Sequence, residues 1–280
     1  MSVLTMTKRA VQRTVRRSTP LTQPGIQEFV RYEGGLFLAG RANKIEAKLL
    51  EGHYDFANIS LCRTLVQPGY VCMDIGANLG VYTVLLAKWA GEGGAVHSFE
   101  PVDHIRRRLL RHVRINGLSN VTVQAMGVGS EDTTLLMNQI REGEFREGTS
   151  TFTDNENVVS MGKEHFNRVE VPVRKLDTYT REQGFTRLDF MKIDIEGFEL
   201  NCLRGATETL RRFRPIILME HNQRRLKHLK IDERDFVQVA NATRYRFYDL
   251  CDYEGKVYLS PFNFDRKLTS GNMVGLPDDF

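Results

Sequence analysis

The chain has 280 residues and a formal net charge of +4, with 39 lysine and arginine residues against 35 aspartate and glutamate residues. The excess positive charge lies in the first twenty residues, which contain no acidic residue, so the remainder is close to neutral. This distribution argues against a strongly basic nucleic-acid-binding protein. No apolar run is long enough for a membrane-spanning helix, and the length suits one large α/β domain with additions.

The N-terminal segment, residues 1–30, is expected to be a basic tail. Its basic residues are Lys8, Arg9, Arg13, Arg16 and Arg17. An arginine-rich start without acidic residues is also typical of an organelle transit peptide, which stays open as an alternative. The four cysteines form no Cys-x-x-Cys pair. This pattern indicates reduced thiols, no zinc site and a cytoplasmic protein.

Residues 31–67 are expected to form an N-terminal cap region that is helical or mixed, with helix fragments at 45–50 and 59–65. The sequence Gln67-Pro68-Gly69 then predicts a turn. From residue 68 to residue 280 the chain alternates between strand and helix patterns, which is typical of an α/β domain.

The stretch from Val71 to Ala90 is the most informative part of this domain. An apolar strand ends at Asp74, a turn bracketed by Gly76 and Gly80 follows, and apolar residues then repeat at helical spacing. Strand, glycine turn and helix form the opening unit of a doubly wound sheet. Glycine lets a ligand approach the backbone, and the helix start presents unpaired N–H groups. The turn can therefore hold a nucleotide-like ligand or a carboxylate.

The residues of this turn favour S-adenosylmethionine over a dinucleotide. A dinucleotide site would carry Gly-x-Gly-x-x-Gly, whereas this turn reads Asp-Ile-Gly-Ala-Asn-Leu-Gly. Asp74 can orient the cationic methionine end of S-adenosylmethionine, and the helix start can favour its carboxylate. Glu100 ends the next predicted strand, at a spacing from Asp74 that suits binding of the ribose hydroxyls.

The rest of the chain continues the alternation of strands and helices. We expect buried strands at 95–99, 121–125, 188–195 and 215–220, and helices at 103–115, 198–213 and 232–242. The segments 245–250 and 256–259 predict a hairpin. The segment 169–173 predicts an edge strand because it contains Pro172, and the charged run 224–230 is expected to be a solvated surface.

Residues 130–171 break this alternation. They are polar, contain several glycines and show little periodicity. Insertions of this length in a compact domain are usually functional, so this segment is expected to be a lid or a substrate loop.

Four sequence blocks resemble the FkbM-type methyltransferases, a branch of the class I S-adenosylmethionine-dependent enzymes. In chain order they are Asp74-Ile-Gly-Ala-Asn-Leu-Gly-Val-Tyr-Thr83, Phe99-Glu-Pro101, Asn116-Gly-Leu-Ser-Asn-Val121 and Lys192-Ile-Asp-Ile-Glu-Gly-Phe-Glu199, the last continued by Leu203-Arg-Gly-Ala206. The resemblance runs from about residue 68 to residue 222. With the alternation of elements, it predicts a Rossmann-like, doubly wound, mostly parallel seven-stranded sheet with an antiparallel C-terminal hairpin.

The resemblance also implies an activity, namely methyl transfer from S-adenosylmethionine, usually to a hydroxyl oxygen. The expected acceptor is a small molecule or glycan, such as a sugar or a polyketide-like natural product, and no nucleic-acid partner is expected. By matching position, the resemblance implies that the cofactor binds at Asp74, Gly76, Asn78, Gly80, Thr83, Glu100, Pro101, Gly127, Val128 and Asp194.

The expected chemistry points to acidic residues at two strand ends. A sugar hydroxyl is a poor nucleophile near neutral pH and needs a general base or a metal to take its proton. In doubly wound sheets the reacting centre lies beyond the carboxyl ends of the strands, where two buried strands deliver Asp194, Glu196, Glu220 and His221. We hypothesise that Asp194 or Glu196 positions or deprotonates the acceptor, with His221 as the second candidate for the base.

Each of these roles has an alternative. Asp194 can bind the cofactor, Glu196 can cap the helix that follows, and His221 can be an ordinary surface histidine. A magnesium site made by carboxylates from two strand ends is also open, although no ligand spacing requires a metal.

Two other function classes remain as alternatives. An NAD(P)-dependent oxidoreductase could share the fold, but the dinucleotide fingerprint is missing. A nucleic-acid methyltransferase is the second, but the chain lacks an Asn-Pro-Pro-Tyr/Phe-type motif and an aromatic-rich basic patch. Binding of NAD would favour the first alternative, and salt-sensitive binding of RNA would favour the second.

Overall fold

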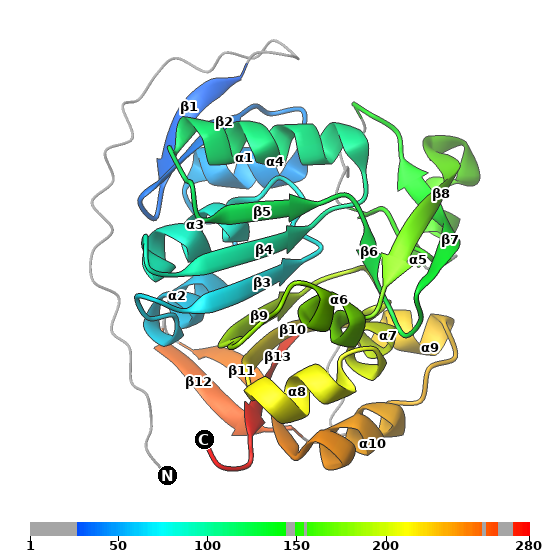
Figure 1. Cartoon of the computed structure of the whole chain (residues 1–280). Coiled ribbons are helices and arrows are strands. Elements are labelled where there is room, and N and C mark those ends of the chain that lie inside the picture. Colours follow the sequence, from blue (N-terminus) through cyan, green and yellow to red (C-terminus); the bar gives the residue numbers. More distant parts are fainter. Residues whose placement is uncertain (1–26, 144–148, 154–155, 254–255, 263–270) are drawn as a thin grey trace.

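The computed structural model describes residues 27–143, 149–153, 156–253, 256–262 and 271–280. It has a large central sheet with helices on both faces (Figure 1). The predictions for residues 1–26 of the basic tail lie outside the described residues. None of the described helices combines the length and the apolar character needed to cross a membrane.

The large sheet has eight strands in the order β12-β11-β13-β10-β9-β3-β4-β5. From β10 to β5 neighbouring strands run parallel, and β13, β11 and β12 are antiparallel to their neighbours. In chain order the strands are β3 (Val71–Ile75), β4 (Ala95–Phe99), β5 (Val121–Gln124), β9 (Phe190–Ile193), β10 (Ile216–His221), β11 (Tyr245–Tyr253), β12 (Lys256–Pro261) and β13 (Gly271–Pro277).

This sheet confirms the α/β fold class, the parallel core and the C-terminal hairpin. It has eight strands where seven were expected, because β13 was not predicted. β13 pairs with β10 on one side and β11 on the other, so the hairpin of β11 and β12 forms the edge of the sheet. The strand order reverses between β3 and β9, and in such sheets ligands bind beyond the carboxyl ends of the strands at that point.

Helices cover both faces of the sheet and bury consecutive strand residues on opposite sides. Cys72 packs with α2 and α3 on one face, whereas Met73 packs with α6, α7, α8 and α10 on the other. These helices are α2 (Phe56–Leu65), α3 (Val81–Ala90), α6 (Leu176–Glu182), α7 (Glu199–Arg204), α8 (Thr207–Phe213) and α10 (Arg234–Thr243). Because helices cover both faces, the inner parallel strands are mainly apolar, although Asp74 and Lys192 are buried within them.

The helix expected at 198–213 is divided into α7 and α8. The break occurs at Gly205, where a Cβ atom would lie 1.9 Å from the carbonyl oxygen of Gly129. The main chain of the segment after β6 (Gly127–Val128) therefore packs directly against this break.

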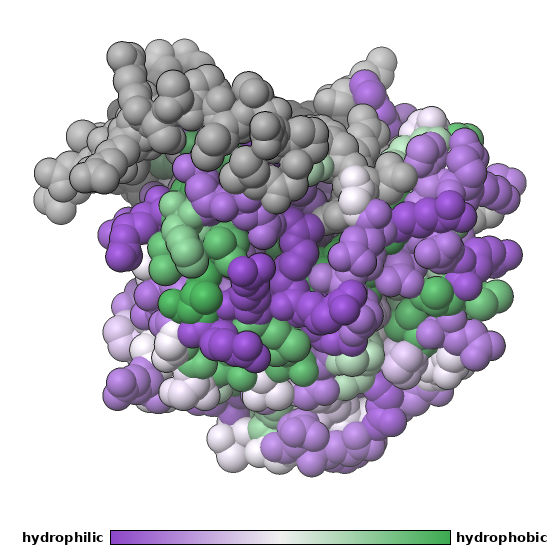
Figure 2. All heavy atoms as spheres, turned by 90° about the horizontal axis from the view of Figure 1, so that it is seen from above, coloured by the Kyte–Doolittle hydropathy of each residue, from purple (hydrophilic) through white to green (hydrophobic). Residues whose placement is uncertain are grey.

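The segment expected as a helical or mixed cap contains a hairpin, β1 (Glu28–Tyr32) and β2 (Gly35–Ala39), ahead of α1 (Lys44–Glu51) and α2. The buried carboxylate of Glu46 in α1 pairs with Arg108 of α4 (Asp103–Ile115), which docks the segment on the domain. In Figure 2, which shows the molecule from above, hydrophilic residues alternate with apolar patches on the part that is not drawn in grey.

Residues 130–171 contribute to a second, three-stranded sheet with the order β6-β8-β7, which lies beyond the carboxyl ends of the parallel strands (Figure 1). Its elements are β7 (Thr133–Ile140), α5 (Glu156–Met161), the 3-10 helix η2 (Lys163–His165) and β8 (Phe166–Arg174). The prediction of an edge strand around Pro172 is wrong, because β8 is the middle strand. β6 is two residues long and pairs only from Val173 onward, so it needs no N–H group from Pro172.

Candidate active site

The turn after β3 is held tightly between the ends of β4 and β9. The N–H groups of Gly76 and Ala77 both donate to the carbonyl oxygen of Phe99. Gly76 has a φ of 79°, and a Cβ atom there would lie 1.9 Å from the main-chain oxygen of Asp194. Glycine is required here both for its conformation and for this close approach.

Asp74 lies fully buried beneath this turn. Its Oδ2 accepts a hydrogen bond of 2.6 Å from the hydroxyl of Thr83, and its Oδ1 lies 3.7 Å from Nζ of Lys192. Oδ1 has no hydrogen-bond partner among the described residues. Burial raises the pKa of Asp74, and the charge of Lys192 acts in the opposite direction. Asp74 and Thr83 therefore support the turn from below and line neither of the cavities described next.

The first cavity, called here the apolar cavity, lies between the turn after β3, the end of β4 and the segment around β6. Its apolar lining comes from Phe99, Ile105, Met126, Val128, Met137 and Phe152. Pro101 and Gly127 also line it. A flat aromatic base can be enclosed by such a surface, and Met137 and Phe152 are supplied by the insertion.

Glu100 gives this cavity its polar group. Its two carboxylate oxygens accept hydrogen bonds of 2.9 Å from the N–H groups of Asn78 and Val102. Burial nevertheless raises the pKa of Glu100 to about 7. A carboxylate oriented by two main-chain donors retains free lone pairs, which can accept from a pair of ribose hydroxyls. The carboxylate of Glu100 and the apolar lining thus fit the ribose and the adenine of S-adenosylmethionine.

A second cavity of about 380 Å³, called here the polar cavity, adjoins the first. It is bordered by α1, by Tyr54 and by charged residues at the ends of β9 and β10. Four residues border both cavities: Gly76, Asn78, Asp194 and Glu196. The two cavities therefore meet at the carboxyl end of β9.

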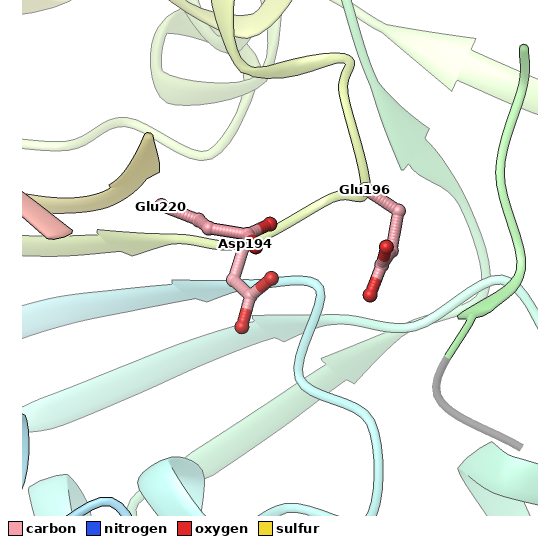
Figure 3. Close-up of side chains that lie close together, drawn as sticks. All are labelled: Asp194, Glu196 and Glu220. Carbon is pink, nitrogen blue, oxygen red and sulfur yellow. The ribbon is translucent and has the colours of Figure 1, made fainter. Parts of the chain in front are cut away.

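Three carboxylates converge at this junction (Figure 3). Asp194 follows β9, Glu196 lies two residues further along, and Glu220 belongs to β10, with one oxygen of each within 4.8 Å of the others. Glu220 has a pKa raised well above its ordinary value, by burial and then by the like charges of Asp194 and Glu196. Such crowding of carboxylates in a cavity is typical of a functional site.

Two buried cations balance the carboxylates. Arg225 of α9 (Gln223–His228) is 5% exposed and pairs with Glu196 at 2.8 Å and with Glu220. Nζ of Lys192 lies 3.4 Å from Oδ2 of Asp194. Burial alone would lower the pKa of Lys192, but the charges of Asp194 and Asp74 outweigh it and raise that pKa.

The main chain at Glu196 adopts an unusual conformation. Glu196 has a φ of 56° and Gly197 a φ of 101°, and a Cβ atom on Gly197 would lie 2.8 Å from Cδ of Arg225. The hydroxyl of Thr151 in the insertion donates to the carbonyl oxygen of Glu196 at 3.0 Å. Left-handed residues other than glycine cluster at functional sites, and here the surrounding contacts fix that conformation.

The family model for the FkbM methyltransferase domain matches residues 74–247, which is more than half of the chain. The chain belongs to the FkbM methyltransferase family. The match includes the turn after β3, the carboxylate cluster and Arg225, and S-adenosylmethionine is the cofactor expected for this methyltransferase.

Individual relatives of the FkbM domain are distant. The AMB antimetabolite synthetase AmbE of Pseudomonas aeruginosa is 26% identical over 57% of this chain and 9% of its own length. The 31-O-demethyl-FK506 methyltransferase FkbM of Streptomyces tacrolimicus is 25% identical over 51% of this chain and 62% of its own length. The alignments thus cover less than two thirds of either relative. The crystal structure of methyltransferase FkbM from Methylobacillus flagellatus is 15% identical, with a TM-score of 0.45 over 83% of this chain and 52% of that chain.

His221 of this FkbM domain lies apart from the carboxylate cluster. It is 3% exposed and makes edge contacts with Phe236 and Phe262 at ring distances of 6.1 and 5.0 Å. It borders neither cavity, and burial lowers its pKa to about 4. The sequence suggested either a surface position for His221 or a position beside the acceptor. The structure shows neither.

The other predicted residues of the FkbM domain divide into two groups. The structure brings Gly76, Asn78, Glu100, Pro101, Gly127, Val128, Asp194 and Glu196 to the walls of the cavities. Asp74 and Thr83 lie below the turn, and Gly80 precedes α3, where a Cβ atom would lie 2.7 Å from Leu109. The last three support the turn.

The sequence reasoning missed both cations of the FkbM site. Lys192 is the direct neighbour of Asp74 across the parallel pair of β9 and β3, and it precedes Asp194 by two residues. Period-two alternation could have placed it on the same face as those carboxylates. Arg225 was assigned to a solvated charged run, and that prediction is wrong, because its guanidinium is buried against Glu196 and Glu220.

The carboxylate cluster also has the donor chemistry of a divalent-cation site, since carboxylate oxygens suit Mg²⁺. Arg225 and Lys192 already supply positive charge to all three side chains. A metal ion would have to displace these cations or share the carboxylate oxygens with them. The arrangement therefore favours a methyltransferase site in which Arg225 and Lys192 balance the carboxylates.

Proposed function

We propose that this chain transfers the methyl group of S-adenosylmethionine to a hydroxyl oxygen of a sugar, glycan or polyketide-like natural product. The observation that carries this proposal is the meeting of the two cavities at Gly76, Asn78, Asp194 and Glu196. Methyl transfer requires the donor and acceptor to touch at one point while each is held elsewhere. One apolar and one polar cavity that share a wall of carboxylates provide this geometry.

The residues of the apolar cavity would hold the cofactor. Glu100 would accept from the ribose hydroxyls, and the side chains around Met126 and Phe152 would enclose the adenine. When bound, the cofactor supplies an electrophilic methyl group on a sulfonium. The carboxylates at the junction favour this positive charge, and positioning of the acceptor then carries much of the rate.

Asp194 is our candidate for the residue that positions or deprotonates the acceptor hydroxyl, with Glu196 as the second. Both carboxylates border both cavities and each pairs with a cation, but the side chain of Asp194 is 44% exposed and that of Glu196 only 18%. The proton leaves the acceptor oxygen, a carbon–oxygen bond forms, and the carbon–sulfur bond breaks. A general base of this kind contributes typically about 10²- to 10⁴-fold.

The acceptor class is supported only by analogy. The relative from Streptomyces tacrolimicus carries a name that specifies methylation of 31-O-demethyl-FK506, an oxygen acceptor. The polar cavity, at about 380 Å³, has room for a single sugar ring or a comparable group of a larger molecule.

Ligand-dependent thermal stability tests the proposed cofactor. Ligand at about a hundred times its Kd adds roughly 2.7 kcal/mol to the free energy of unfolding. We expect a clear rise in Tm with S-adenosylhomocysteine and none with NAD. The Gly76→Ala variant, whose Cβ atom would clash with the main chain of Asp194, should lose the rise. A rise with NAD alone would replace this proposal by an oxidoreductase.

Single-turnover methyl transfer to a hydroxylated acceptor tests the assignment of the base. Asp194→Asn should lower the rate at least a hundredfold, by the lower limit given for a general base of about 10², while affinity for S-adenosylhomocysteine is retained. Full activity in both Asp194→Asn and Glu196→Gln would remove these carboxylates from the chemistry.

A further inference from the structure

Two lysines of α1 border the polar cavity. Lys44 and Lys48 are four residues apart and therefore project from the same face of the helix. Lys44 is exposed and Lys48 half-buried. They belong to the N-terminal segment, whereas the carboxylates of the same cavity come from the ends of β9 and β10.

Neither lysine side chain forms an ion pair or a hydrogen bond with any residue that the structure describes; the main-chain oxygen of Lys48 accepts from the N–H of His53. The acidic residue between them, Glu46, is turned away and binds Arg108 and the N–H of Gly40. The last residue of α1, Glu51, lies 3.3 Å from His53. Two positive charges thus face the cavity without a compensating carboxylate on their own helix.

The carboxylates of the polar cavity already have cationic partners. Glu196 and Glu220 pair with Arg225, and Asp194 pairs with Lys192. Because Lys192 is also shared with Asp74, the carboxylates outnumber these two cations, and the excess negative charge complements the net positive charge of S-adenosylmethionine. The charges of Lys44 and Lys48 remain for the other molecule that must enter the cavity.

We infer that the methyl acceptor carries an anionic group, a phosphate or a carboxylate, which Lys44 and Lys48 bind while its hydroxyl faces Asp194. This inference rests on the proposed function and narrows its acceptor class. Lysine ammonium groups bind such anions as point charges with three donors each. Two lysines at one face of a helix can bind one group together.

The first experiment excludes the competing explanation, in which the two lysines bind the carboxylate of the cofactor. Isothermal titration of S-adenosylhomocysteine is compared between the wild type and the double variant Lys44→Gln/Lys48→Gln. We expect Kd values within about twofold. A loss of tenfold or more would assign the lysines to the cofactor and overturn the inference. Absence of binding to the wild type would instead contradict the proposed function.

The second experiment measures the preference for an anion. Glucose, glucose 6-phosphate and glucuronate are titrated into the protein saturated with S-adenosylhomocysteine. Two charge-assisted contacts predict that an anionic probe binds about tenfold more tightly than glucose. Comparing glucose 6-phosphate with glucuronate shows whether the lysines prefer a phosphate or a carboxylate. The preference should weaken in concentrated salt, because screening shortens the reach of the lysine charges.

A matched control makes this comparison specific. Lys88 is an exposed lysine of α3 that borders neither cavity, so Lys88→Gln removes the same charge elsewhere. We expect the preference to survive in Lys88→Gln and to disappear in the double variant. Equal affinity for all three probes, or a preference that survives in the double variant, would overturn the inference.

Discussion

Gly76 and Asp194 approach each other so closely that a methyl group on Gly76 would lie 1.9 Å from the carbonyl oxygen of Asp194. The turn after β3 is therefore shaped by the end of β9, and the main chain of Gly76 forms part of the wall that the two cavities share with Asp194 and Glu196. Any side chain at position 76 must push the two strand ends apart.

Gly76→Ala should abolish binding of S-adenosylhomocysteine and lower Tm. Gly69→Ala is the matched control, because Gly69 has a similar φ of 85° but no atom within 4 Å of its Cβ position. Both variants bear the strain of a left-handed alanine, about 1–2 kcal/mol, and only Gly76→Ala adds a clash. Titration calorimetry and thermal unfolding measure the difference. Equal behaviour of the two variants would contradict this account.

Arg225→Gln should destabilise the protein and impair methyl transfer. Removing the buried guanidinium leaves Glu196 and Glu220 without their partner, which for a buried pair costs about 3–5 kcal/mol. Chemical denaturation and single-turnover kinetics check the two effects. The neighbouring Arg224 is exposed, so Arg224→Gln should change neither; a comparable loss in that variant would argue against a special role for Arg225.

Affinity for S-adenosylhomocysteine should decrease as pH falls through about 7. Burial raises the pKa of Glu100 to about 7, so lowering the pH protonates it and removes acceptor capacity for the ribose hydroxyls. At one unit below the pKa about a tenth of the carboxylate is ionised, and affinity should fall by up to about tenfold. Glu100→Gln should bind weakly without this pH dependence. A wild-type affinity that is constant from pH 8 to pH 6 would exclude the role.

His221→Phe should leave the rate of methyl transfer within about twofold of the wild type. The histidine packs against Phe236 and Phe262, and its Nε2 has no hydrogen-bond partner among the described residues. Nε2 also lies 3.7 Å from Oε1 of Glu233. Because a phenyl ring is larger than imidazole, the variant should lose about 1–3 kcal/mol of stability through overpacking. Single-turnover kinetics give the readout, and a hundredfold loss in a folded variant would restore His221 as a candidate base.

Elements with a strong local pattern were predicted well. The helix at 103–115 and the strand at 95–99 match α4 and β4 residue for residue, because their apolar spacing is encoded locally. The turn after β3 was located for the same reason, through its acidic residue and two glycines.

The features that the sequence did not predict correctly depend on contacts between distant segments of the chain. β8 is central because β6 and β7 flank it, and no local pattern specifies those neighbours. In the sequence Arg225 resembles the surface charges around it, and only the fold places Glu196 and Glu220 beside it. His221 follows an apolar strand and was expected near the acceptor, but alternation along β10 turns it toward the aromatic core.

The hydrogen bond from Thr151 to the carbonyl oxygen of Glu196 has a consequence for protein engineering. Exchanging the insertion for that of another family member is an obvious way to redirect such an enzyme to a new acceptor. The incoming segment would also have to supply a hydroxyl at the position of Thr151, because the left-handed main chain at Glu196 relies on it. Chimeras that retain this threonine should therefore keep their turnover more often than chimeras matched only in length.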